Sequence, residues 1–169
     1  MAILLQTLFD ITLLRKGPEH IPASWILFGI AVLLRTLAVI LLLEALNQFS
    51  TESEQIDLLP AILSELVIWL FGLMCFGGLV VAIGKRERLA QTLTALVGIG
   101  AIVTFVIALV ALLGGSLFSA QRVLVVMQLG LLWSVVVKGH IMARATDWHW
   151  YAGLLISVGV LLLQLFAGQ

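Results

Sequence analysis

Two opposite charges stand inside otherwise apolar stretches of this 169-residue sequence. Arg35 and Glu65 are each flanked by runs of Leu, Ile, Val and Ala. A charged group at the centre of a membrane helix costs at least about 2.5 to 3.5 kcal/mol, so each residue needs a partner or a function. Gln128, inside a later apolar stretch, could add hydrogen bonds to the same group. These three residues are the candidate intramembrane polar cluster.

The positions of Arg35 and Glu65 predict that they lie at the same depth. Arg35 is nine residues before Glu44, and Glu65 is eight residues after Asp57. If consecutive helices run antiparallel, a rise of 1.5 Å per residue places both roughly 12 to 14 Å from the same acidic side. Gln128 lies at a similar depth in its own stretch.

Three interpretations of this cluster stay open. Arg35 and Glu65 could form an ion pair that sets the register of two helices, with Gln128 satisfying the remaining hydrogen bonds. Alternatively, Glu65 could be the proton or cation site of a small transporter or channel, with Arg35 as its counter-charge. In the third interpretation, the side chains reach the acidic face separately.

The composition favours a membrane as the solvent for this chain. Hydrophobic residues make up 62% and charged residues 11% of it, and the mean hydropathy is +1.20. Soluble domains have about 45–50% and 25%, respectively. Nine basic residues balance nine acidic ones, so there is no basic bias and we expect no nucleic-acid partner.

Five apolar stretches are long enough, or nearly so, to cross a bilayer, which takes about 20 residues in a helix. The predicted spans are residues 22–44, 58–83, 92–113, 123–143 and 150–167. We therefore predict an all-α, polytopic transmembrane helical bundle over residues 21–169. Pro22 is expected in the first turn of the first span, because a proline lacks only an N–H that has no partner there.

Residues 1–20 are expected to form a short amphipathic helix in the membrane interface, followed by a linker. Gln6, Thr7 and Asp10 interrupt the apolar residues of this segment, so it does not suit a span. Its basic residues follow the apolar stretch and no cleavage site comes after it, so we expect it to be retained. Pro18 is expected to end this helix.

The basic residues predict the orientation. With five spans, seven of them fall on the N-terminal side and only Arg122 falls opposite. The seven are Arg15, Lys16, Lys85, Arg86, Arg88, Lys138 and Arg144. The positive-inside rule then predicts the N-terminus in the cytoplasm and the C-terminus outside. We expect the membrane itself to be a bacterial inner (cytoplasmic) membrane. We expect these residues to face anionic lipid headgroups, with the long stem of Lys138 reaching up to them.

No motif for catalysis, a cofactor or a metal is recognisable. Glycine-rich phosphate loops, GxSxG elbows and paired catalytic carboxylates are absent, so we expect neither an enzyme nor a bound cofactor. His20, His140 and His149, with Asp147 close to the last, lack the spacing of metal ligands, so we expect no metal site. These histidines are interpreted as interfacial side chains.

The layout of the chain resembles the Yip1 domain superfamily and its small bacterial relatives. The resemblance rests on five closely spaced helices and on residues 15–24, particularly Gly17, Pro18, Pro22 and Ser24. It implies a non-enzymatic membrane protein that acts through partners or lipids. The DLYGP-type motif and the long polar N-terminal region of the trafficking members are missing, so binding of small GTPases is not implied.

The function expected from the sequence is a non-catalytic accessory, assembly or lipid-organising role in the membrane. Its partners would be membrane lipids and either another membrane protein or a second copy of the chain in a parallel homo-oligomer. The alternative is a small proton- or cation-coupled transporter or channel that uses Glu65, Arg35 and Gln128.

Overall fold

The computed structural model describes residues 2–49, 56–114 and 120–167, and the regular elements in these ranges are all helical. They are α1 (Ala2–Thr12), α2 (Trp25–Asn47), α3 (Leu58–Ala82), α4 (Leu89–Gly114), α5 (Ala120–Thr146) and α6 (Trp150–Ala167). Short 3₁₀ turns, Pro18–His20 and Arg86–Arg88, join some of them. The predicted all-α bundle is confirmed.

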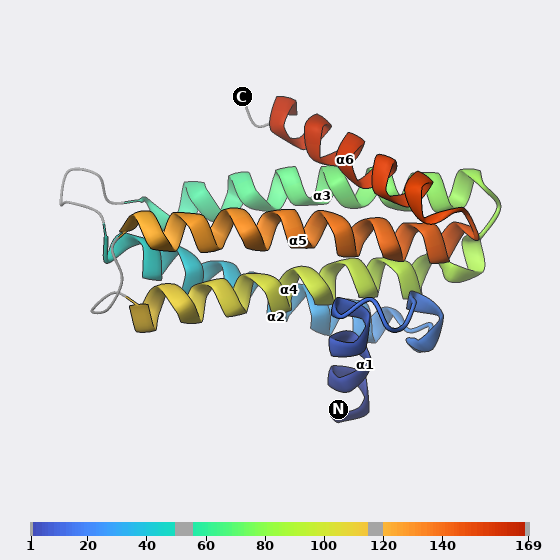
Figure 1. The fold of residues 1–169 in the computed structure, drawn as a ribbon, viewed down its shortest axis with the longest axis horizontal. Coiled ribbons are helices and arrows are strands. Elements are labelled where there is room, and N and C mark those ends of the chain that lie inside the picture. Colours follow the sequence, from blue (N-terminus) through green and yellow to red (C-terminus); the bar gives the residue numbers. More distant parts are fainter. Residues whose placement is uncertain (1, 50–55, 115–119, 168–169) are drawn as a thin grey trace.

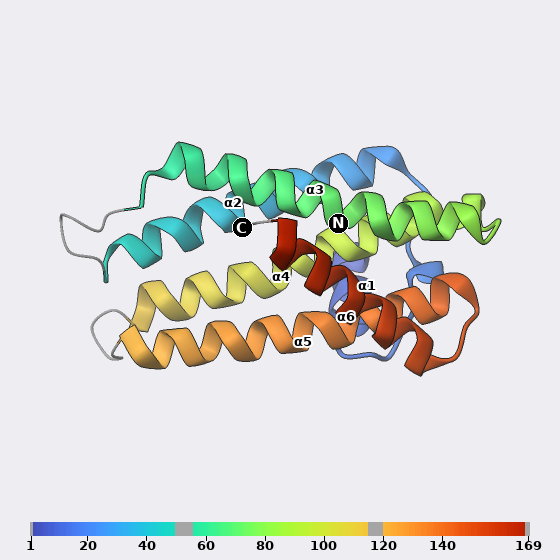
Figure 2. The same ribbon diagram turned by 90° about the horizontal axis from the view of Figure 1, so that it is seen from above.

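Helices α2 to α5 run along the length of the molecule (Figure 1). In the described residues these four helices are long and apolar enough to cross a membrane, by length and composition. This is the build of a membrane-embedded protein. The shorter α6 leaves the end of α5, crosses obliquely over the bundle and stops part-way along it (Figure 2). The expected fifth span is therefore present as a helix, and its crossing of the membrane stays a prediction.

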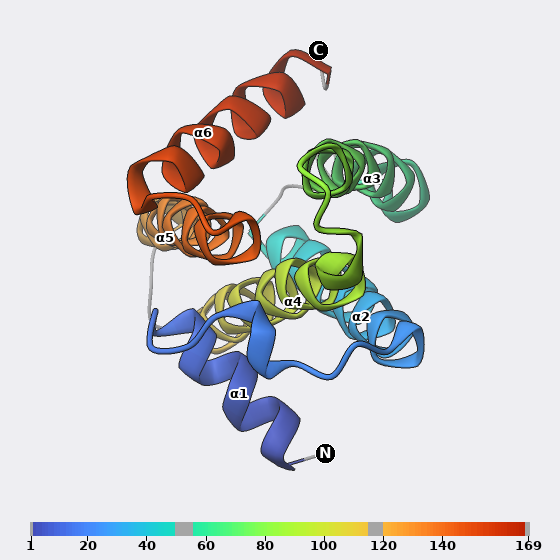
Figure 3. The ribbon, with the colours of Figure 1, turned by 90° about the vertical axis from the view of Figure 1, so that its right-hand side faces the viewer.

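Helix α2 packs along α4, whereas its neighbour in sequence, α3, lies further off (Figure 3). The two packed helices run in the same direction. On α2 the buried side chains include Ala31, Ala38 and Ala45, at intervals of seven residues. Such small side chains let two helix backbones approach closely, which in a membrane supplies the van der Waals contact that holds helices together. Small buried side chains on α2 thus suit its close packing along α4.

Helices α5 and α6 meet at two glycines. A Cβ on Gly153 would collide with the carbonyl oxygen of Gly139 and would lie 2.7 Å from the nitrogen of Ala143. A Cβ on Gly139 would lie 2.8 Å from the Cα of Leu154. Since the obstructing atoms belong to the backbone, no side-chain movement could make room. The close approach of α5 and α6 therefore depends on glycine at both positions.

Helix α1 lies across the bundle, nearly perpendicular to its long axis (Figure 1 and Figure 3). Its side chains Leu8 and Ile11 are buried, and Leu8 packs over Gly98 of α4. Eleven residues are too few to span a bilayer. The predicted short N-terminal helix is present, and its position in the membrane interface stays a prediction.

Two expected helix boundaries were wrong. Helix α2 begins at Trp25 instead of Pro22, because Ser24 is the N-cap and its Oγ accepts a hydrogen bond from the Leu27 nitrogen at 3.5 Å. Helix α1 ends at Thr12, well before Pro18. A left-handed residue, Leu14 (φ 61°), turns the chain there. Pro18 starts the following 3₁₀ turn.

Candidate functional site

Arg35 and Glu65 meet between α2 and α3. The Arg35 Nη2 donates to the Glu65 Oε1 at 2.6 Å. The Arg35 side chain is 16% exposed and the Glu65 side chain 43%. The two charges whose depths agree in the sequence are therefore also turned toward each other, which excludes the interpretation that they reach the acidic face separately.

Arg35 also binds α4. Its Nη1 donates to the carbonyl oxygen of Gly100 at 3.0 Å and to the hydroxyl oxygen of Thr104. The Arg35 side chain passes close to Gly100, where an added Cβ would lie in ordinary van der Waals contact, 3.8 Å from the Arg35 Cδ. A single arginine thus joins α2, α3 and α4.

Gln128 does not join this cluster. Its side chain is exposed on the outer face of α5, and it is not among the residues that line the cavity described below. The depth of Gln128 would allow contact with Arg35 and Glu65. However, a helix turns by about 100° per residue, so depth does not fix the direction of a side chain. The inward face of α5 carries Gly130, Ser134 and Lys138 instead. The cluster expected from the sequence is wrong in this third member.

Gln164 of α6 provides the amide that Gln128 does not. Its Nε2 donates to the Ile68 carbonyl oxygen of α3 at 2.9 Å. The amide lies directly over Gly72, where a Cβ would come within 2.9 Å of the Gln164 Cδ. Because this contact joins the last helix to the third, no spacing within one helix could have predicted it.

These polar groups line a cavity of about 470 Å³ between α2, α3, α4, α5 and α6. Its polar side chains are Arg35, Glu65, Thr104, Ser134, Lys138 and Gln164. The rest of the wall is glycine or apolar: Leu42, Ile68, Trp69, Gly72, Leu73, Phe76, Leu96, Gly100, Val103, Ile107, Met127, Gly130, Leu131, Leu161 and Leu165. The cavity therefore combines an apolar wall with a few charged groups.

Lys138 lines this cavity. This corrects the expectation that it reaches the lipid headgroups at the end of the bundle where most basic residues lie, which we call the basic end. Helix α5 continues without interruption to Thr146, so Lys138 lies eight residues inside its end. The Cα–Cβ bond of a helical residue tilts toward the helix N-terminus, which for α5 is the opposite end of the bundle. The lysine stem is thereby directed deeper, and its ammonium lies within electrostatic reach of Arg35 and Glu65.

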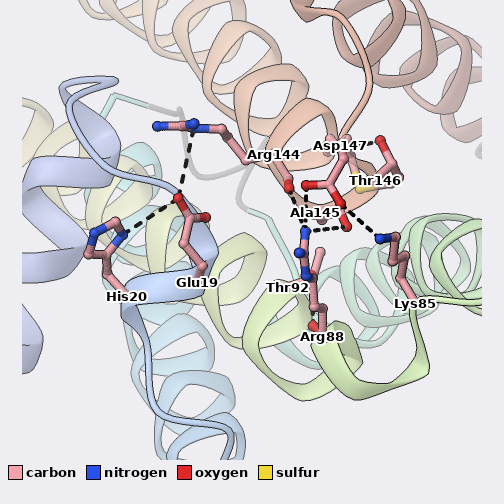
Figure 4. A network of polar contacts seen from close by, with 10 residues as sticks. Glu19, His20, Lys85, Arg88, Thr92, Arg144, Ala145, Thr146 and Asp147 are labelled. Carbon is pink, nitrogen blue, oxygen red and sulfur yellow. Dashed lines mark hydrogen bonds and ion pairs between the residues drawn. The ribbon is translucent and has the colours of Figure 1, made fainter.

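A second polar network closes the basic end of the bundle (Figure 4). The Asp147 carboxylate accepts from Lys85 Nζ and from Arg88 Nη1, both at 2.8 Å. The same Arg88 nitrogen donates to the carbonyl oxygens of Arg144 at 3.2 Å and Ala145 at 3.4 Å. A cation at these last carbonyls of α5 is favoured by the helix dipole. The network connects the α3–α4 turn to the α5–α6 turn.

Asp147 reaches this network because of its backbone conformation. Its φ of 58° is left-handed, and the Trp148 nitrogen donates back to the Ala143 carbonyl oxygen at 2.9 Å. This turn terminates α5 and is one that aspartate tolerates better than most residues. The hydrogen bond from Lys85, followed by that from Arg88, lowers the pKa of Asp147 to about 2.

The N-terminal segment makes further polar contacts at this end. Lys16 pairs with Asp10 at 2.7 Å, and Arg144 approaches Glu19 at 3.9 Å. His140 of α5 lies 3.1 Å, through its Nε2, from the Lys16 carbonyl oxygen. Several basic residues expected to face lipid thus have acidic partners within the protein. Two others, Arg15 and Arg86, are exposed.

Within the part of the chain that the structure describes, no group of three or more His, Cys, Asp or Glu side chains is arranged to hold a metal ion. The fold and the cavity define an all-α bundle with four helices of membrane-spanning length around a polar site. Comparison with known proteins gives no match: no family model, no curated protein and no solved structure is similar to this chain.

Proposed function

We propose that this protein is a non-catalytic integral membrane protein that binds a lipid between its helices and so has a lipid-organising or accessory role. The observation that carries the proposal is the cavity of about 470 Å³ with its largely apolar wall. Sites for small molecules have volumes of roughly 300–1,000 Å³ and combine apolar walls with a few placed polar groups. An apolar hollow inside a bilayer suits the acyl chains of the surrounding lipid.

The proposed location is a bacterial inner membrane, with the N-terminus in the cytoplasm. The excess of basic residues on one side supports it. Exposed Arg15 and Arg86 at that end are available for anionic headgroups. The resemblance to small Yip1-like proteins points to the same non-enzymatic kind of role, exercised through lipids, a membrane-protein partner or a second copy of the chain.

Filling the cavity tests this function. Ser134 lines the cavity, and its Oγ donates to the Leu131 carbonyl oxygen of its own helix at 2.8 Å, with no hydrogen bond to another helix among the described residues. Ser134→Phe should therefore occupy the space without breaking a contact between helices. Leu132→Phe adds a ring to an exposed position on the same helix and is the matched control.

The measurement is native mass spectrometry of protein purified in mild detergent. We expect the unaltered protein and Leu132→Phe to retain a lipid that Ser134→Phe loses. Equal retention in all three, or none in the unaltered protein, would contradict lipid binding in this cavity. Circular dichroism and gel filtration should show that the variants remain folded.

A small proton- or cation-coupled transporter or channel is the second candidate. It is favoured by the presence of Glu65 in the cavity wall beside Arg35, since charged groups inside membrane proteins often mark ion pathways. Purified protein in liposomes should then move protons or cations, and Glu65→Gln should abolish the flux. Flux no greater than that of empty liposomes would reject this candidate.

A further inference from the structure

The charges that face the cavity do not balance. Arg35 and Lys138 are cationic and Glu65 is anionic, whereas the other polar wall residues, Thr104, Ser134 and Gln164 among them, are neutral. One positive charge is therefore left over. In a low-dielectric environment an unpaired charge is costly, so such a site favours an ion of opposite sign.

The surplus charge is at Lys138. Arg35 is engaged by Glu65, by the Gly100 carbonyl oxygen and by Thr104. For the Lys138 ammonium, in contrast, the described residues provide no hydrogen bond of the side chain and no ion pair. An ammonium has three donors and no acceptor, so its natural partner is a phosphate or carboxylate oxygen.

We propose that Lys138 binds the anionic head of an amphipathic molecule, a phosphate or carboxylate that carries an acyl chain. This inference rests on the proposed function, because it names the chemical class of the lipid that the cavity holds. The acyl chain would lie along the apolar wall, which Phe76, Leu96 and Leu161 help to form.

The depth of Lys138 favours an amphiphile over a free anion. Lys138 lies eight residues from the end of α5, about 12 Å along the helix axis. A hydrated inorganic anion would have to lose its water to reach this depth. An amphiphile is already held in the membrane by its chain, so its head is present beside the cavity at a high effective concentration that a free anion lacks.

The test compares three ligands with the delipidated protein in neutral detergent: phosphatidylglycerol, oleate and inorganic phosphate, with diacylglycerol, which has neither phosphate nor carboxylate, as the uncharged reference. We expect phosphatidylglycerol and oleate to be retained over diacylglycerol by about tenfold, the ratio that one charge-assisted hydrogen bond supplies. Inorganic phosphate at equal concentration should displace neither. Displacement of the lipid by inorganic phosphate would overturn the assignment to an amphiphile.

Three variants locate the charge that matters. Lys138→Met keeps the length of the stem and should lose the preference for anionic lipid while still binding diacylglycerol. Lys138→Arg should keep the preference, and Arg122→Gln, which removes a positive charge from the exposed start of the same helix, should keep it too. An unchanged preference in Lys138→Met, or none in the unaltered protein, would overturn the role of Lys138.

These outcomes separate this inference from the proposed function. If Ser134→Phe removes bound lipid but the unaltered protein does not discriminate between lipids by charge, the cavity binds lipid and only the assignment of an anionic headgroup is rejected. If Ser134→Phe retains lipid as the unaltered protein does, lipid binding in this cavity itself fails.

Discussion

The Arg35 guanidinium lies 2.6 Å from the Glu65 carboxylate, although α2 packs chiefly along α4 and not along α3. The pair therefore connects two helices that share little other contact. Arg35 also donates a hydrogen bond to Thr104, which is on α4. A contact of this kind sets the rotation and the depth of α3 relative to the rest of the bundle.

Removing one member of the Arg35–Glu65 pair should destabilise the folded protein more than removing both members together. Arg35→Leu or Glu65→Leu leaves one member of the ion pair without the other inside the bundle, whereas the double change removes both members. We expect each single variant to unfold at lower temperature, and the double variant to lose less than the sum, with a coupling of about 1 kcal/mol or more. The measurement is thermal or denaturant unfolding in detergent.

The control for this cycle is Glu44, an exposed acidic residue further along α2. Glu44→Gln combined with Arg35→Leu should give additive losses. Additive losses for Arg35 and Glu65 as well would mean that the two charges do not stabilise each other.

The contact between α5 and α6 should not tolerate a methyl group. Gly153→Ala would place its Cβ against the Gly139 carbonyl oxygen and the Ala143 nitrogen, so we expect a loss of about 1–3 kcal/mol in the free energy of unfolding. Gly159→Ala is the matched control on α6, because no atom lies within 4 Å of the added Cβ. It should be neutral or stabilising by up to about 1 kcal/mol. Equal effects of the two changes would contradict the close approach.

Asp147 should make the stability depend on acid pH. Its pKa of about 2 in the folded protein is below the value of about 3.9 in an unfolded chain. The ionised carboxylate therefore contributes stability above about pH 4, and this contribution is lost as the pH falls toward about 2. We expect the melting temperature to fall across that window, and to fall less steeply in Asp147→Asn.

Asp57→Asn provides the control for this pH dependence, since Asp57 is exposed at the start of α3 and makes no side-chain capping bond. Its acid profile should match that of the unaltered protein. Added salt should reduce the contribution of Asp147, because exposed charges are screened. An acid profile that is identical with and without Asp147 would reject the role of its bonds to Lys85 and Arg88.

The proposed orientation can be tested with single cysteines. In a Cys75→Ser background, Arg86→Cys places a thiol at the basic end and Gln48→Cys places one beyond α2, at the opposite end. A membrane-impermeant maleimide applied to intact cells should label Gln48→Cys, and should label Arg86→Cys only after lysis. The reverse pattern would invert the orientation.

A tag after Gln169 tests the fifth span. If α6 crosses the membrane, the tag should be accessible from the same side as Gln48→Cys. Accessibility from the side of Arg86→Cys would leave four spans, with α6 contained within the bundle or the lipid.

The sequence alone determined the class of the fold, the number and approximate bounds of the helices, and the common depth of Arg35 and Glu65. Hydropathy and the rise per residue act along one dimension, so the length of an apolar stretch and the distance of a residue from its end can be counted directly. The same counting placed Gln128 at a depth similar to that of Arg35 and Glu65, but it did not determine toward which side of the helix the Gln128 side chain points.

The tertiary structure decided which faces meet. It turned Gln128 outward, brought Gln164 into the cavity, paired α2 with α4 and directed Lys138 inward. Each of these depends on the rotation of one helix about its axis relative to another, which packing at positions such as Ala38 or Gly153 sets. Rotation is a relation between elements distant in the sequence, and the order of residues within one helix does not contain it.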